Sequence, residues 1–127
     1  MSFYTAINCM DGRVQLPVIS YLQDRFKADY IDSITEAGPV LYLAGKIDSE
    51  QTSSILHRTD ISINHHKSTG IAVIAHHDCA GNPTEDNIQI SQLQLAINFL
   101  AGHYPKVKII GLWVDETGSV EEVCSTS

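Results

Sequence analysis

The chain has 127 residues and a mass of 14.0 kDa, which is enough for one folded domain, and residues 1–127 are predicted to form it. Acidic residues outnumber basic ones by 15 to 8, and the basic residues are scattered, which argues against nucleic acid and membranes as partners. The sequence shows neither a signal peptide nor an apolar run of membrane-spanning length, so we expect a soluble, cytoplasmic protein.

The first part of the chain predicts two strands, each followed by a helix. Residues 3–9 are β-prone, and the segment after them carries apolar residues at helical spacing, with Pro17 in the first turn of the expected helix. Residues 30–35 fit a second strand. The turn at Gly38 then leads into a short helix over residues 39–43.

The remaining chain continues the alternation of helices and strands. Asp48 to His66 predicts a half-exposed helix, and residues 70–75 form a continuous apolar run that is typical of a central parallel strand. An amphipathic helix over residues 88–102 and a fourth strand over residues 107–114 follow. Beyond Asp115 we expect only a short polar tail.

This order of elements predicts an α/β fold. The expected domain has three layers, with a central, mainly parallel four-stranded sheet of order 2-1-3-4 flanked by helices. Ligands of such sheets bind beyond the carboxyl ends of the strands, where the strand order reverses. That point lies between strands one and three, and two clusters of reactive side chains follow those strands, at residues 9–13 and 76–79.

The two clusters together offer a set of metal ligands. Cys9, His76 and Cys79 supply two thiolates and one imidazole, which zinc accepts in a tetrahedral site. Three protein ligands leave one position open, as in catalytic zinc sites. Two alternatives stay open: the three residues could simply be buried in the core, or Asp11 could be a fourth ligand of a structural zinc ion.

The motifs Cys9-x-Asp11-x-Arg13 and His76-x-x-Cys79 resemble the paired signatures of the β-class carbonic anhydrases. The resemblance implies that Cys9, His76 and Cys79 bind zinc. It also implies that Asp11 and Arg13 form a catalytic dyad beside the metal-bound water. Because the family is oligomeric, and because a sheet of this size leaves its edges uncovered, we expect a homodimer or a larger homo-oligomer.

The expected function is that of a carbonate dehydratase-like lyase. It is the reversible hydration of carbon dioxide to bicarbonate by a metal-bound hydroxide, with Zn2+ as cofactor. The alternatives are hydrolysis of carbonyl sulfide or carbon disulfide at the same site, and a noncatalytic zinc-binding protein of the same fold. The segment after the second strand departs from the family, which commonly has Arg-x-Ala-Gly-Asn there. This chain keeps the Ala-Gly pair but has Thr35 and Pro39 in place of the Arg and the Asn.

Overall fold

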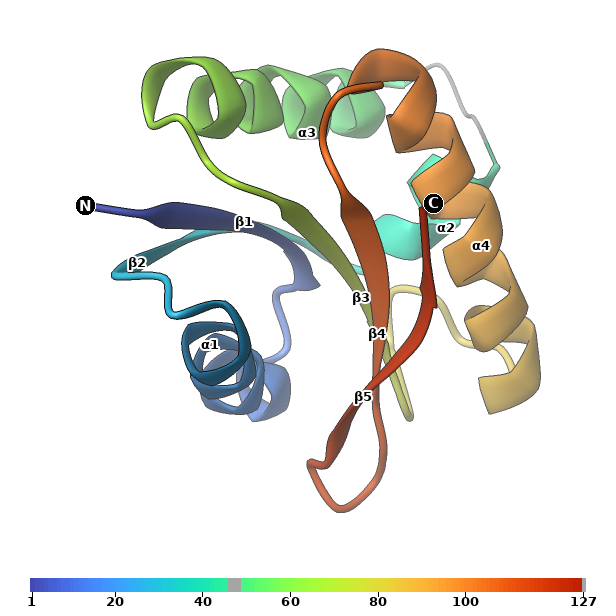
Figure 1. The fold of residues 1–127 in the computed structure, drawn as a ribbon. Helices are drawn as coiled ribbons and strands as arrows, with labels where there is room; N and C mark the ends of the chain where they lie inside the picture. The colour runs from blue at the N-terminus through green and yellow to red at the C-terminus, as the bar shows by residue number, and fades with distance from the viewer. Residues whose placement is uncertain (46–48, 127) are drawn as a thin grey trace.

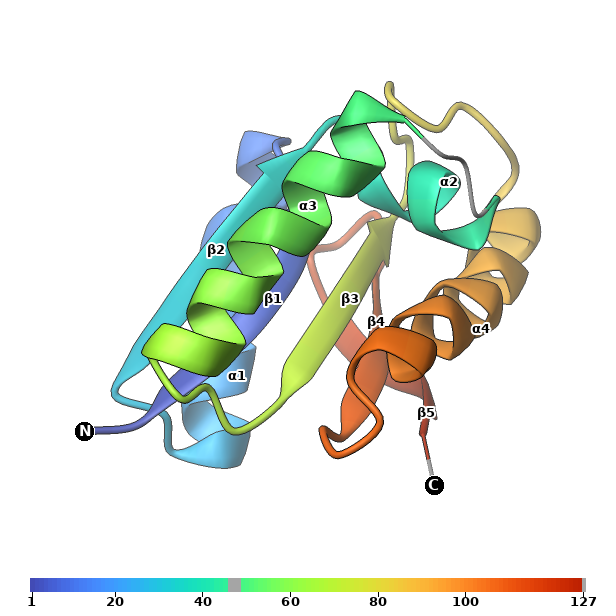
Figure 2. The same cartoon turned by 90° about the horizontal axis from the view of Figure 1, so that it is seen from above.

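A five-stranded sheet forms the centre of the fold, and helices cover both of its faces (Figures 1 and 2). The computed structural model describes residues 1–45 and 49–126. In chain order the elements are β1 (Phe3–Cys9), α1 (Gly12–Phe26), β2 (Tyr30–Glu36), α2 (Pro39–Ala44), α3 (Glu50–Asp60), the π-helix η1 (Ile61–His65), β3 (Ile71–His76), α4 (Asp86–His103), β4 (Ile109–Val114) and β5 (Val120–Ser125). The predicted three-layer α/β architecture is confirmed.

The strand order is β2-β1-β3-β4-β5, with the first four strands parallel to their neighbours. The predicted order 2-1-3-4 is therefore right, but the predicted number of four strands is wrong. The expected polar tail contains β5, which pairs antiparallel with β4. Gly111 pairs with Cys124, but the next residue, Leu112, pairs with Glu122. The register therefore shifts at this point, and one residue of β5 has no partner in β4. The bulge breaks the alternation of apolar and polar residues that would have marked the strand.

Two hydrophobic cores lie on opposite faces of the sheet. One core lies under α2, α3 and α4, and the other lies under α1, which is the only described helix on the opposite face (Figure 1). Every residue of β3 and β4 is buried because both faces of these central strands are covered. The Cys9 and Cys79 side chains belong to the core on the α1 face.

The start of α1 lies closer to β1 than the sequence predicts. Asp11 caps this helix by accepting a hydrogen bond from the backbone N–H of Arg13, so the helix begins at Gly12. Pro17 consequently lies inside the helix and not in its first turn. The helical segment therefore follows Cys9 almost directly, and its first residues lie at the carboxyl edge of the sheet.

The helix predicted from Asp48 to His66 is shorter and changes its winding. Its first residue, Asp48, lies outside the described residues. The α-helical part ends at Asp60, where the π-helix η1 takes over and buries Ser62. Within residues 1–45 and 49–126, no helix is both long enough and apolar enough to cross a membrane.

Candidate metal centre

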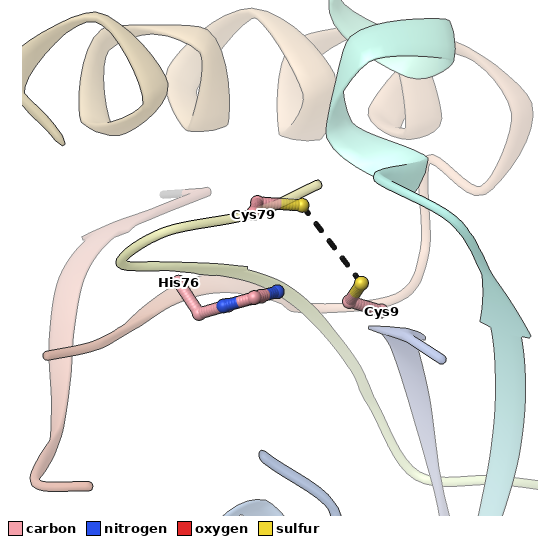
Figure 3. A group of neighbouring side chains, drawn as sticks. All are labelled: Cys9, His76 and Cys79. Atoms are coloured by element: carbon pink, nitrogen blue, oxygen red, sulfur yellow. Dashed lines mark hydrogen bonds between the residues drawn. The ribbon is translucent and has the colours of Figure 1, made fainter. Parts of the chain in front are cut away.

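The carboxyl ends of β1 and β3 bring Cys9, His76 and Cys79 together (Figure 3). Cys9 is the last residue of β1, His76 is the last residue of β3, and Cys79 lies three residues further along the chain. One potential ligand atom of each residue lies within 4.8 Å of those of the other two, and all three residues are buried. The arrangement predicted from the two motifs is therefore present in the structure.

The two sulfur atoms are spaced as a tetrahedral zinc ion requires. Cys9 Sγ and Cys79 Sγ lie 3.8 Å apart. Zinc–sulfur bonds of about 2.3 Å at a tetrahedral angle place two thiolates about 3.8 Å from each other. The pair therefore fits two ligands of one ion without a change in separation.

The third candidate ligand presents a nitrogen lone pair. His76 Nδ1 lies 2.8 Å from the backbone carbonyl oxygen of His77, to which only a protonated nitrogen can donate. This contact leaves the proton on Nδ1 in the neutral ring, with the lone pair on Nε2. In the part of the chain that the structure describes, the buried Nε2 atom has no hydrogen-bond partner. A metal ion bound by the two sulfurs would supply that partner.

The two thiols are coupled through their mutual hydrogen bond. Donation from Cys79 lowers the pKa of the Cys9 thiol to about 4, although burial acts in the opposite direction. The same hydrogen bond, together with burial and the charge on Cys9, raises the pKa of the Cys79 thiol. The shared hydrogen bond therefore favours one thiolate over two in this pair, and a bound cation would compete with the remaining proton.

The predicted dyad is formed by a close ion pair at the edge of this site. Arg13 Nη2 lies 2.7 Å from Asp11 Oδ2, and Arg13 Nε lies 3.1 Å from Oδ1. These hydrogen bonds lower the pKa of the Asp11 carboxyl to about 2. Arg13 Nη2 also donates to the Asp78 carbonyl oxygen at 3.0 Å, so one guanidinium group joins the two segments that carry the candidate ligands.

A small cavity gives access to this edge of the sheet. It has a volume of about 230 Å³, and its lining includes Arg13, His76 and Val114. Among the described residues, the Asp11 carboxylate is not part of the group formed by the three candidate ligands. The cavity therefore borders both the His76 imidazole and the Arg13 member of the ion pair.

The sequence did not predict a second cluster of titratable side chains beside the first. His77 Nδ1 lies 2.9 Å from Asp86 Oδ2, and Glu116 completes a group whose atoms lie within 4.8 Å of one another. The hydrogen bond to Asp86 raises the pKa of the half-buried His77 ring. These residues come from three separate segments, and their spacing in the sequence carries no signal that would have joined them.

Both the sequence and the fold are similar to those of known proteins. A family model described as "Putative carbonic anhydrase" matches residues 1–124 of the chain. One of two tetrameric β-carbonic anhydrases from the filamentous ascomycete Sordaria macrospora superposes with a TM-score of 0.64 at 15% identity, over 98% of this chain and 82% of that chain. The β-carbonic anhydrase CcaA gives a TM-score of 0.56 at 15% identity, with coverages of 94% and 78%. No curated protein sequence matches the chain.

A further solved structure shares the fold. The β-carbonic anhydrase CafA of the fungal pathogen Aspergillus fumigatus gives a TM-score of 0.52 at 12% identity, over 94% of this chain and 74% of that chain. At such identities the three structures establish a common fold.

Proposed function

Because the chain belongs to this carbonic anhydrase family, matched over residues 1–124, we propose that it catalyses the reversible hydration of carbon dioxide to bicarbonate. The membership confirms the resemblance that the two sequence motifs predicted. The observation that carries the proposal is the buried group of Cys9, His76 and Cys79, which offers two sulfurs and one unpartnered nitrogen among the described residues. We propose that these three residues hold one zinc ion.

Zinc bound by three protein ligands keeps one position for water, lowers the pKa of that water towards neutrality, and so supplies a nucleophile for the carbon of carbon dioxide. The protein's own contribution is to hold the ligands and to orient the attacking water. The His77 carbonyl holds the His76 ring in the tautomer whose Nε2 faces the sulfurs. The site is thus arranged before the ion binds.

We assign Asp11 the role of orienting the water molecule. With a pKa of about 2 its carboxyl stays ionised at neutral pH, so it accepts a hydrogen bond and does not take up the proton. Arg13 fixes the position of this carboxylate through its side chain and through its backbone N–H, which lies 2.8 Å from Oδ1. The role of Arg13 is therefore to hold Asp11 charged and in one rotamer.

The alternative in which Asp11 is a fourth ligand of a structural zinc ion has less support. Swinging onto the ion would break the hydrogen bonds that both carboxylate oxygens make with Arg13. It would also remove the cap of α1. The contacts favour a carboxylate that stays beside the metal, and therefore an open coordination position.

We also propose that the protein acts as a homo-oligomer. Met10 and Leu16, which flank the start of α1 close to the site, are 65% and 76% exposed. No described strand pairs with the outer edge of β2. The Sordaria macrospora relative is tetrameric. Sedimentation velocity at micromolar concentration tests this point, and a monomer there would contradict it.

The experiment that tests the proposed reaction is a stopped-flow assay of carbon dioxide hydration on protein with measured zinc content. We expect activity that rises with zinc occupancy and that disappears in Cys79→Ser. Zinc-loaded protein that is inactive between about pH 6 and 9, where such a water ionises, would overturn the proposed reaction. Parallel assays with carbonyl sulfide and carbon disulfide separate the carbon dioxide reaction from its sulfur analogues.

A further inference from the structure

The hydrogen-bonded ladder between β1 and β3 ends before it reaches the candidate ligands. Its last pair is Ile7 with Val73, so Cys9, His76 and Cys79 all lie beyond it. The backbone hydrogen bonds of the ladder therefore do not fix the separation of the two segments that carry the ligands. Other contacts have to hold these segments at the distance that one metal ion requires.

Arg13 spans this gap from the first turn of α1. Its Nη2 atom donates to the Asp78 carbonyl oxygen at 3.0 Å, and its Nη1 atom lies 3.5 Å from Asp78 Oδ2. Apart from the three candidate ligands, Arg13 is the described side chain of residues 8–13 that forms hydrogen bonds with residues 74–79. The guanidinium group therefore joins the two segments where the ladder no longer does.

The residue that Arg13 contacts has an unusual backbone conformation. Asp78 has a φ of 56°, in the left-handed region that residues with a side chain rarely adopt. It directly precedes Cys79, so a change in its backbone angles would move the Cys79 sulfur. Aspartate tolerates this region better than most residues, but less well than glycine. Surrounding contacts must therefore stabilise this turn.

The carbonyl groups of residues 77–79 all accept hydrogen bonds. The His76 ring donates to the first at 2.8 Å, Arg13 donates to the second at 3.0 Å, and the backbone N–H of Asn82 donates to the third at 3.3 Å. His76 and Asn82 belong to the same stretch of chain as the turn. Arg13 belongs to the other ligand-bearing segment, and the carbonyl that it holds is that of the left-handed residue Asp78.

We propose that Arg13 positions Cys79 for the metal: by holding the Asp78 carbonyl, it keeps this turn in its left-handed form and the Cys79 sulfur at its distance from the Cys9 sulfur. This role is additional to the orientation of Asp11. It rests on the metal centre of the proposed function, but it does not depend on which molecule reacts there. Arg13 is a positioning residue here, since it acts on the metal only through Asp78 and Cys79.

The exposure of Arg13 limits the size of the effect. Its side chain is 61% exposed, so water competes for its hydrogen bonds. Residues that orient metal ligands without touching the metal typically change metal affinity by about ten- to a hundredfold. We therefore expect an effect at the lower end of this range, about tenfold in zinc affinity.

Zinc affinity in an Asp11→Asn background separates this role of Arg13 from the one through Asp11. The background variant has no carboxylate at residue 11 that Arg13 could hold or that could swing onto the metal. Adding Arg13→Gln should lower zinc affinity, measured by competition with a chelator, about tenfold. Adding Arg25→Gln is the matched control, because Arg25 lies in the last turn of the same helix and pairs with Glu122 at 2.9 Å. This control should keep the affinity of the background within about twofold.

Two outcomes of this comparison would overturn the proposal. Unchanged zinc affinity on adding Arg13→Gln would mean that Arg13 acts on the site through Asp11 alone. A general loss of stability would lower the melting temperature of the metal-free protein, while its zinc affinity and the sulfur-to-cobalt charge-transfer band of its cobalt-loaded form would equal those of the Arg25→Gln control. We expect instead that this band shifts on adding Arg13→Gln and not in the control.

A change at residue 78 tests the role of the turn. Glycine adopts a φ of 56° without a steric cost, so in Asp78→Gly the turn should depend less on Arg13. With Asp78→Gly present in the same background, Arg13→Gln should lower zinc affinity by about threefold or less. An undiminished loss of about tenfold would show that Arg13 does not act through the conformation of this turn.

Arg13→Lys in the otherwise unchanged protein is a second variant, and it decides if the double variant does not fold. The lysine ammonium is a single point charge that pairs with the Asp11 carboxylate in preference to a neutral carbonyl. The variant thus keeps a cation beside Asp11 and loses the contact with Asp78. Zinc affinity should again fall about tenfold, and wild-type affinity would contradict the proposal.

The metal binding of the wild-type protein distinguishes a failure of this proposal from a failure of the proposed function. Wild type that binds zinc but does not hydrate carbon dioxide contradicts the proposed reaction alone. Wild type that binds no metal contradicts both. An active zinc protein whose affinity does not respond to Arg13→Gln in the Asp11→Asn background contradicts the positioning role alone.

Discussion

The sulfur atoms of Cys9 and Cys79 lie 3.8 Å apart, although 70 positions in the sequence separate the two cysteines. They meet because β1 and β3 are adjacent parallel strands whose carboxyl ends lie at the same edge of the sheet. Everything between the two strands, including β2 and α3, forms the connection that returns the chain to this edge. A metal ion at this point would join the two ends of a long connection.

Protein purified without added metal should contain about one zinc ion per chain, because two thiolates and one imidazole suit zinc. Cys79→Ser should lose the ion, since it removes one of the sulfurs. Cys124→Ser is the matched control, because this half-buried thiol on β5 lies outside the group of candidate ligands. Elemental analysis measures both variants. Full occupancy in Cys79→Ser would exclude the proposed ligand set.

Removal of the metal should lower the melting temperature by something on the order of 10 °C. An ion present at about a hundredfold above its dissociation constant contributes roughly 2.7 kcal/mol, and each kcal/mol corresponds to about 4 °C in a domain of this size. Calorimetry with and without a chelator checks this. The Cys79→Ser protein should not respond to the chelator. An equal response of that variant would show that the chelator acts elsewhere.

Asp11→Asn should keep zinc and lose turnover by about a hundredfold or more. Asparagine also caps helices well, so this variant removes the charge of residue 11 and retains the start of α1. Asp24→Asn changes an exposed carboxylate in the same helix and serves as the control. Hydration rates at equal zinc content compare the two variants. Wild-type turnover in Asp11→Asn would remove Asp11 from the mechanism.

The Asp11 carboxyl should titrate near pH 2 in the folded, metal-free protein, because the hydrogen bonds from Arg13 favour its ionised form. Its folded pKa lies below the usual value of about 3.9. The stabilisation from this pair is therefore complete above about pH 4, and it is lost as the pH falls through about 2. Carbon-13 NMR of the carboxyl group follows the titration. Arg13→Gln should move the midpoint upward, and an ordinary midpoint in wild type would contradict the ion pair.

The strands could be predicted from local sequence patterns, and the candidate ligands could be predicted from the topology of a parallel sheet. The apolar run of β3 identifies a buried strand, and a parallel sheet must place the ends of β1 and β3 at one edge. These two facts together predict that Cys9 and His76 lie close together at this edge. The cytoplasmic location stays a prediction.

Features that depend on long-range contacts could not be predicted. The bulge in β5 disrupts the alternation of apolar and polar residues that would identify a strand. A glycine in the sequence indicates a turn, but it does not indicate which other segment of backbone lies against that turn. Gly38 and Gly81 meet only in the folded chain. The same is true of His77 and Asp86, whose segments are joined by the approach of α4 to the end of β3.

The position of the three candidate ligands within the first 79 residues has a consequence for biosynthesis. A chain grows from its N-terminus on the ribosome, so all three side chains are made before α4, β4 and β5 exist. In the complete sheet β3 lies between β1 and β4. Zinc captured by the nascent chain would fix the pairing of β1 with β3 first, and β4 and β5 would then add to a sheet whose register is already set.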